Sequence, residues 1–169
     1  MILPVLQYPD PRLTRKSAPV EEITPRIREL AADMAETMYA RDGIGLAAPQ
    51  VGETLRLVVL DLSGPDRRED LRVLVNPEFT LSGVELESDE GCLSVPDYSA
   101  KVVRREFAAV RAVDLEGRPV VFDASGHLSV CVQHECDHLE GILFIDRLSR
   151  LKREMLDKRL KKKITDHAR

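Results

Sequence analysis

The first strong hydrophobic pattern follows an N-terminal arm that four prolines should keep extended and irregular. Thr24 is a candidate N-cap and Pro25 suits the first helical position. Asp42-Gly43 should end the helix, with the glycine in the left-handed conformation. Between these limits, apolar residues recur every three or four positions, which predicts a helix with one buried face. That face comprises Ile27, Leu30, Ala31, Met34 and Met38.

The middle of the chain has the pattern of a β-sheet. Short runs rich in β-branched and other apolar residues alternate with glycine, proline and charged residues, which is typical of strands joined by turns. Glu116-Gly117 is a candidate turn. The predicted strands lie at 55–62, 71–75, 84–87, 109–114 and 120–122.

Two helices are predicted in the last third of the chain. One begins near Asp123 or Ser125 and runs through the segment QHECDHL to Gly141, and the other occupies 149–163. Helices at both ends of a strand-rich middle indicate an α+β fold rather than a repeating βαβ sheet. We therefore predict one compact domain over 1–169, with antiparallel or mixed strands around the QHECDHL helix and a basic C-terminal helix and tail. The last helix should bury Leu151, Met155 and Leu160.

Composition narrows the class of protein. The chain has 169 residues, 43% hydrophobic and 32% charged, which is typical of a globular domain with a sizeable core. A net charge of −4 argues against a general nucleic-acid binder, although KRLKKK near the end is locally basic. We read no secretory signal and no membrane-spanning stretch, so we predict a cytoplasmic protein. Its three cysteines, Cys92, Cys131 and Cys136, should be free thiols or metal ligands rather than a disulfide framework.

The segment His134–His138 reads HECDH, an HExxH motif. On a helix its two histidines lie about 40° apart on one face and can bind one divalent metal. Glu135, next to His134, can reach a water on that metal, whereas Cys136 points away and should be a packing residue. The alternative is a surface helix with two histidines. The apolar neighbours Val130 and Leu139 argue instead for a partly buried helix, in which histidines need partners.

A hydrolytic metal site usually has three protein ligands and one open position, so a third ligand must come from elsewhere. Glu154 lies sixteen residues after His138, a spacing that an HExxH peptidase can use, but its basic neighbours favour a solvated ion pair. His167 lies close to the end of the chain, where a helix is expected to fray. Cys92 is the remaining candidate, because a thiolate is a strong ligand for Zn²⁺ or Fe²⁺.

Three segments, in this order, resemble one family. They read GIGLAAPQ (43–50), EGCLS (90–94) and QHECDH (133–138). With the YPDPRL start, they extend a resemblance to peptide deformylases over nearly the whole chain. The resemblance implies an α+β fold with the HExxH helix at its centre and removal of the N-formyl group from the initiator methionine of nascent chains. It also implies one divalent metal, commonly Fe²⁺ in the cell, with Zn²⁺, Ni²⁺ or Co²⁺ as substitutes.

The resemblance further implies a mechanism in which the metal keeps its fourth position for water or hydroxide. The metal should lower the pKa of this water, and Glu135 should take its proton as general base. Hydroxide then attacks the formyl carbon, and the oxyanion donors of the family correspond to Gln50 and the backbone N–H of Leu93. One such donor contributes on the order of 3 kcal/mol. The implied metal ligands are Cys92, His134 and His138.

The substrate should be held along its backbone and by its methionine side chain. Backbone pairing is expected at Ile44, Gly45 and Gly91, where glycines allow close approach, although plain turn geometry explains the glycines equally well. The methionine side chain should enter an apolar pocket formed in part by Val130 and Cys131, which can equally be core residues.

The sequence departs from the family at Ser99, where some relatives carry a basic residue near the substrate entrance, so any contact made by that residue is in doubt here. Lys101, Arg104 and Arg105 lie nearby, and we expect them to be solvated surface charges.

Several expectations concern the surroundings of the motif and of the protein. Gln133 should make a hydrogen bond that supports either a ligand or the fold, and Asp137 orients a histidine, caps a loop or forms a surface ion pair. The basic tail can contact ribosomal RNA or simply complement the helix dipole. We predict a monomer whose partners are N-formylmethionyl nascent peptides and that has no membrane partner. Two rival functions remain, a small HExxH peptidase that uses Glu154 and an interaction module with a structural metal.

Overall fold

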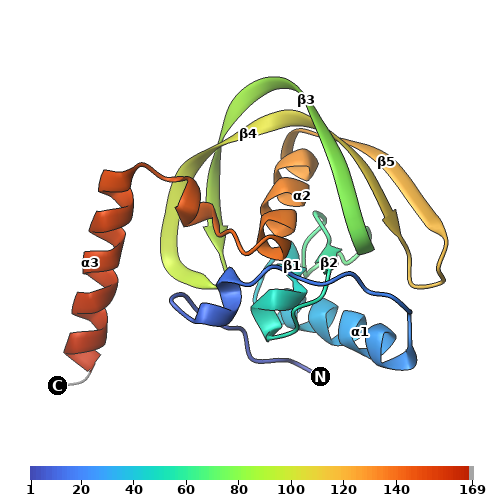
Figure 1. Cartoon of the computed structure of the whole chain (residues 1–169), viewed down its shortest axis with the longest axis horizontal. Coiled ribbons are helices and arrows are strands. Elements are labelled where there is room, and N and C mark those ends of the chain that lie inside the picture. The colour runs from blue at the N-terminus through green and yellow to red at the C-terminus, as the bar shows by residue number, and fades with distance from the viewer. Residues whose placement is uncertain (168–169) are drawn as a thin grey trace.

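A five-stranded antiparallel sheet follows the chain in sequence order, β1-β2-β3-β4-β5 (Figure 1). With three α-helices it forms the single α+β domain that the sequence predicts. The structure is a computed structural model that describes residues 1–167, with side chains as far as residue 163. The strands are β1 (Gly45–Ala47), β2 (Leu57–Leu60), β3 (Arg72–Cys92), β4 (Val95–Val113) and β5 (Pro119–Ser125). The helices are α1 (Pro25–Ala40), α2 (Gly126–Leu139) and α3 (Arg150–His167), with 3₁₀ turns at Pro11–Thr14, Ala48–Val51 and Phe144–Arg147.

β3 and β4 form one long hairpin that arches over α2 (Figure 1). Register shifts, including those after Ser82 and Gly91, mark positions where extra residues bend and twist the hairpin. Gly83, at one shift, has a φ of 82°, a left-handed conformation that glycine adopts without strain. The strands predicted at 84–87 and 109–114 are too short, because they cover only parts of β3 and β4. Much of the hairpin is exposed on one face, and its charged residues break the apolar pattern.

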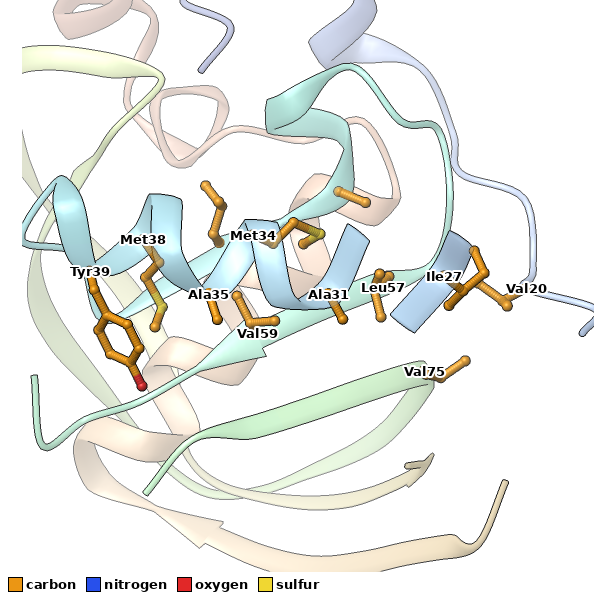
Figure 2. Packing of buried hydrophobic residues seen from close by; sticks show 12 residues of the cluster. Val20, Ile27, Ala31, Met34, Ala35, Met38, Tyr39, Leu57, Val59 and Val75 are labelled. Atoms are coloured by element: carbon orange, nitrogen blue, oxygen red, sulfur yellow. The ribbon is translucent and has the colours of Figure 1, made fainter. Parts of the chain in front are cut away.

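α1 packs its apolar face against β2 (Figure 2). Thr24 caps the helix as predicted, because its hydroxyl oxygen accepts a hydrogen bond from the N–H of Ile27. Leu30 is only partly buried. At the C-terminal end, Asp42 rather than Gly43 adopts the left-handed conformation, with a φ of 57°. Aspartate tolerates this region better than most non-glycine residues. The fully packed residues of the predicted face are Ile27, Ala31, Met34 and Met38.

α2 is almost entirely enclosed, because every residue from Ser129 to Leu139 is buried. It lies beneath the arch of β3 and β4 and also contacts β1, β2 and β5. A helix start at Asp123 is wrong, since that residue belongs to β5 and pairs with β4. Ser125 is the N-cap residue instead. Cys136 packs in the core between α2 and the sheet, as predicted.

α3 stands at one edge of the domain and contacts it along a narrow strip (Figure 1). Leu156 is 2% exposed and Leu160 is partly buried. The prediction that Leu151 and Met155 are buried is wrong, because they are 67% and 62% exposed. Only one side of α3 meets a neighbour, so the other apolar positions face solvent. Within the described part of the chain, no helix is both long and apolar enough to cross a membrane.

Candidate metal centre

Three potential metal ligands converge where α2 passes the end of β3. His134 and His138 lie one turn apart on α2, and Cys92 is the last residue of β3. Their ligand atoms all lie within 4.8 Å of one another, and Sγ of Cys92 is 3.5 Å from Nε2 of His138. The fold thus brings together residues from two motifs that are far apart in the sequence.

This donor set fits a divalent transition metal. Zn²⁺ and Fe²⁺ both accept a thiolate with two imidazoles, and three protein ligands leave a position free. Burial holds the pKa of His138 well below its usual value, so its ring is neutral, the form that binds metal. Oε2 of Glu135 is buried and has no hydrogen-bond partner among the described residues. A polar group held between the ligands would supply the partner that this oxygen lacks.

Glu90 orients one of the two histidines. Its Oε1 lies 2.8 Å from Nδ1 of His134, and its carboxylate accepts two further hydrogen bonds from Arg104. A donor at Nδ1 leaves Nε2 of His134 for a metal. Burial alone would lower the pKa of His134, but the hydrogen bonds with Cys92 and Glu90 outweigh it and raise the pKa to about 10, so a metal that binds at Nε2 must displace a proton. Glu90 was not predicted. The sequence feature that could have identified it is its position two residues before Cys92, because residues two apart on a strand have their side chains on the same face.

Arg104 is a buried cation, so the prediction of a solvated surface charge is wrong. It is 3% exposed, and besides Glu90 it pairs with Asp137, to which its Nη1 donates at 2.7 Å. Asp137 also accepts two hydrogen bonds from Arg147. Of its predicted roles, Asp137 therefore has the ion pair, although this pair is buried rather than at the surface, and it does not orient a histidine. The alternation of side chains along β4 could have indicated that Arg104 is buried, since Arg104 is on the same face of the strand as buried Val102.

Gln133 makes the structural hydrogen bonds that the sequence predicts. Its side-chain amide pairs with the backbone N–H and C=O of Arg105 and donates to Ser129. These contacts fix α2 against β4 on the side away from the ligands. Lys101 is exposed, as predicted, whereas Arg105 is half-buried.

Glu135 lies beside the ligands and against β1. Its Oε1 is 4.0 Å from Nε2 of His134, and burial raises the pKa of its carboxyl group to about 7. A carboxyl group with a pKa near neutrality can both accept and return a proton. Gly45 makes room for it, because a Cβ at Gly45 would lie 2.6 Å from Oε1 of Glu135. Gly45 is thus needed for packing against Glu135. This reason differs from the two inferred from the sequence, which are close approach of the substrate backbone and turn geometry.

Gln50 points its amide group toward the cysteine ligand. Its Oε1 accepts a hydrogen bond from the N–H of Ala47, which fixes the orientation of the amide. Its Nε2 then donates to Oγ of Ser94 at 3.1 Å and to Sγ of Cys92 at 3.4 Å. Ser94 has no predicted role, and it supplies a second anchor for Gln50. Leu93 lies in the short turn between Cys92 and this serine.

The ligands lie at the wall of a cleft of about 750 Å³. His138 is 1% exposed and lies behind this wall. Ser99 also lines the cleft, so the position at which the sequence departs from the family does border it. Burial raises the pKa of the Cys131 thiol to about 12, which keeps it protonated. The predicted residues that line the cleft are Ile44, Gly45, Gln50, Gly91, Cys92, Leu93, Val130, Cys131, His134 and Glu135.

The other candidates for a third ligand lie elsewhere. Glu154 is on α3, where it is exposed and pairs with Arg150 at 3.1 Å. It does not belong to the ligand group, so the peptidase alternative is not favoured. The side chain of His167 lies outside the described residues.

Comparisons with known proteins find relatives that match most or all of the chain. The model of the polypeptide deformylase family matches residues 2–154. A curated peptide deformylase of Azotobacter vinelandii is 50% identical over 167 residues, 98% of this chain and 98% of its own. A crystal structure of a peptide deformylase from Legionella pneumophila has a TM-score of 0.92 at 44% identity, covering 100% of this chain and 99% of that chain. A peptide deformylase from Ehrlichia chaffeensis in complex with actinonin has a TM-score of 0.87 at 38% identity, covering 96% and 97%.

Proposed function

The chain belongs to the polypeptide deformylase family and removes the N-formyl group from nascent peptides, and from this premise we propose how its residues act. Cys92, His134 and His138 hold the divalent metal on which the family depends. The convergence of their donor atoms within 4.8 Å supports this assignment. We propose Fe²⁺ as the metal in the cell, with Zn²⁺, Ni²⁺ or Co²⁺ as substitutes, because thiolate and imidazole ligands accept all four.

Glu135 is the general base. A metal at this centre supplies Lewis acidity, which lowers the pKa of water and polarises the formyl carbonyl. The carboxylate of Glu135 takes a proton from the attacking water and later returns it to the amine of the departing peptide. The buried Oε2 without a hydrogen-bond partner and the pKa near 7 support this role.

Gln50 and Leu93 stabilise the oxyanion that develops on the formyl oxygen. Nε2 of Gln50, from the 3₁₀ turn Ala48–Val51, and the backbone N–H of Leu93, from the turn after Cys92, donate to it. The hydrogen bond that fixes Oε1 of Gln50 to Ala47 supports this role, since a donor held in place before reaction stabilises charge more effectively. Each donor contributes on the order of 3 kcal/mol.

The substrate peptide binds in extended form and adds strand-like hydrogen bonds to Ile44, Gly45 and Gly91. Its methionine side chain enters the apolar part of the cleft beside Val130 and Cys131. A formyl carbon carries only hydrogen, so a tight space beside the metal excludes larger acyl groups. The position of all five residues on the wall of one cleft supports this arrangement.

One observation carries the proposal, namely that a Cys-His-His group lies at the wall of the cleft beside a buried carboxylate oxygen that has no hydrogen-bond partner among the described residues. Glu135→Ala should retain the metal, and its hydrolysis of formyl-Met-Ala should fall by about 100-fold or more. Cys92→Ala should lose both metal and activity. Glu140→Ala, at the exposed end of α2, is the control. Metal retained by Cys92→Ala but lost from Glu154→Ala would support the peptidase instead.

The remaining proposals concern the setting of the enzyme. We propose a cytoplasmic monomer that contacts the ribosome transiently through the basic part of α3, because its substrate emerges there. Sedimentation velocity tests the monomer. Co-sedimentation of the full chain with ribosomes, compared with a Lys158→Glu/Lys162→Glu variant, tests the contact. Equal binding by both proteins would contradict it.

A further inference from the structure

A second, smaller cavity opens beside the cleft, between α3 and the first residues of β4. Its volume is about 300 Å³. Tyr98 and Ser99 line this groove and also line the cleft, so the two cavities border the same two residues. None of the roles assigned above uses the groove. Its lining residues are Tyr98, Ser99, Ala100, Lys152, Met155, Leu156 and Arg159.

The groove is a fixed feature because α3 is tied to the body of the domain. Leu156 is 2% exposed and packs in the core cluster that includes Tyr98 and Ala100. Next to it, Asp157 accepts a hydrogen bond from the hydroxyl of Tyr8 at 2.8 Å, and Arg153 pairs with Asp146. The helix is therefore held both by apolar packing and by polar contacts, and the groove wall that it forms has a defined position.

The lining of the groove defines the chemistry of a ligand. Met155 is 62% exposed although it lies beside the apolar floor made by Ala100 and Leu156. Lys152 and Arg159 are exposed at the rim and make no ion pair among the described residues, and no acidic residue lines the groove. The surface therefore suits an apolar side chain with a carboxylate next to it.

We propose that this groove binds the part of the nascent chain that follows the residues held in the cleft, and that it prefers apolar residues with acidic neighbours. The two lining residues that the groove shares with the cleft, together with its apolar floor and cationic rim, carry the proposal, which rests on the proposed peptide path through the cleft. An extended peptide advances about 3.3 Å per residue, so a chain that leaves the cleft past Ser99 can follow this surface. Short formyl-peptides end before they reach it.

The test compares kcat/KM for three amidated peptides on the metal-loaded full chain. They are formyl-Met-Ala-Ser, the same peptide extended by Leu-Glu-Leu-Glu, and the same peptide extended by Ser-Lys-Ser-Lys. The wild type should favour the Leu-Glu peptide over the Ser-Lys peptide by about fivefold, mainly through KM, since partial burial of one side chain contributes about that factor. Met155→Ser and Lys152→Glu/Arg159→Glu should each bring this ratio close to one.

Formyl-Met-Ala-Ser should react at the same rate with all of these proteins, which separates the groove from the catalytic centre. Leu151→Ser is the matched control, because Leu151 is 67% exposed on the same helix and does not line the groove. A ratio that is unchanged in both groove variants, or equally lost in Leu151→Ser, would overturn the proposal. So would loss of ribosome binding in the charge variant with an unchanged ratio, because the groove would then face RNA. Failure of the wild type on formyl-Met-Ala-Ser would instead refute the proposed function.

Discussion

Oε1 of Glu90 lies 2.8 Å from Nδ1 of His134, and this contact joins the two halves of the metal centre. Glu90 is on β3, two residues before Cys92, whereas His134 is on α2. The strand that carries one ligand therefore also orients another. Because the carboxylate holds Nδ1 of the histidine, Nε2 is directed toward the position between the ligands.

Glu90→Gln should weaken metal binding by about 10- to 100-fold, the usual effect of removing a partner that orients a ligand. The amide keeps the shape of the side chain but loses the charge that holds both His134 and Arg104. Competition with a chromophoric chelator measures the change. Glu87→Gln is the control, since Glu87 is exposed on the same strand. An affinity equal to that of the wild type would show that Glu90 does not orient the ligand.

The parts of the fold that the sequence predicts well are those with a strong local pattern. α1 has a cap, a proline and a periodic apolar face, and the motif on α2 defines its own ligand geometry. The hairpin of β3 and β4 is predicted poorly because a strand with one exposed face carries many charges. The buried face of α3 is mispredicted because periodicity shows that a face exists, not how much of it meets a neighbour. The residues that support the site, Glu90 and Arg104, depend on contacts between distant segments.

Arg104→Met should destabilise the protein by about 3–5 kcal/mol, because it leaves buried carboxylates without their cation. Glu90 loses two hydrogen bonds and Asp137 loses one, although Asp137 retains Arg147. Burial alone would raise the pKa of Glu90, and Arg104 is the main group that holds it below its usual value. Urea unfolding of the metal-free protein measures the effect. Arg105→Met, at a half-buried position on the other face of β4 where the guanidinium holds no carboxylate among the described residues, should cost much less, and equal losses would contradict a special role for Arg104.

Tyr39→Phe should destabilise the protein at neutral pH by about 1–3 kcal/mol, the cost of leaving a buried acceptor without its donor. The hydroxyl of Tyr39 donates to Oδ2 of Asp61 at 2.6 Å, and Asp61 is 0% exposed. Burial would raise the pKa of Asp61, but hydrogen bonds from Ser63 and Tyr39 hold it below its usual value.

This direction of the Asp61 pKa sets the pH dependence of the Tyr39→Phe effect. A carboxyl group with a lowered pKa contributes stability above its unfolded pKa of about 3.9, and the contribution disappears as the pH falls through the lower folded value. The difference between wild type and Tyr39→Phe should therefore be constant near neutrality and shrink below about pH 4. Urea unfolding at several pH values measures it. Tyr8→Phe, whose partner Asp157 is only partly buried, is the control. A difference that grows in acid would contradict the assignment.

Gly45→Ala should lower kcat by about 100-fold while the protein keeps its metal, because a displacement of about 1 Å in a catalytic group has an effect of this size. The added Cβ would lie 2.6 Å from Oε1 of Glu135 and 3.0 Å from its Cγ and Cδ. The carboxylate is buried and the contact includes its inner atoms, so rotation of the terminal group alone does not relieve the overlap. Metal analysis and formyl-Met-Ala kinetics on the same preparation separate the two effects. The three atoms nearest to the added Cβ all belong to Glu135 and none to a ligand, so loss of metal together with activity would show a wider collapse of the centre. Unchanged kcat would mean that Glu135 can act from a different position, and its role as the general base would then need another geometry.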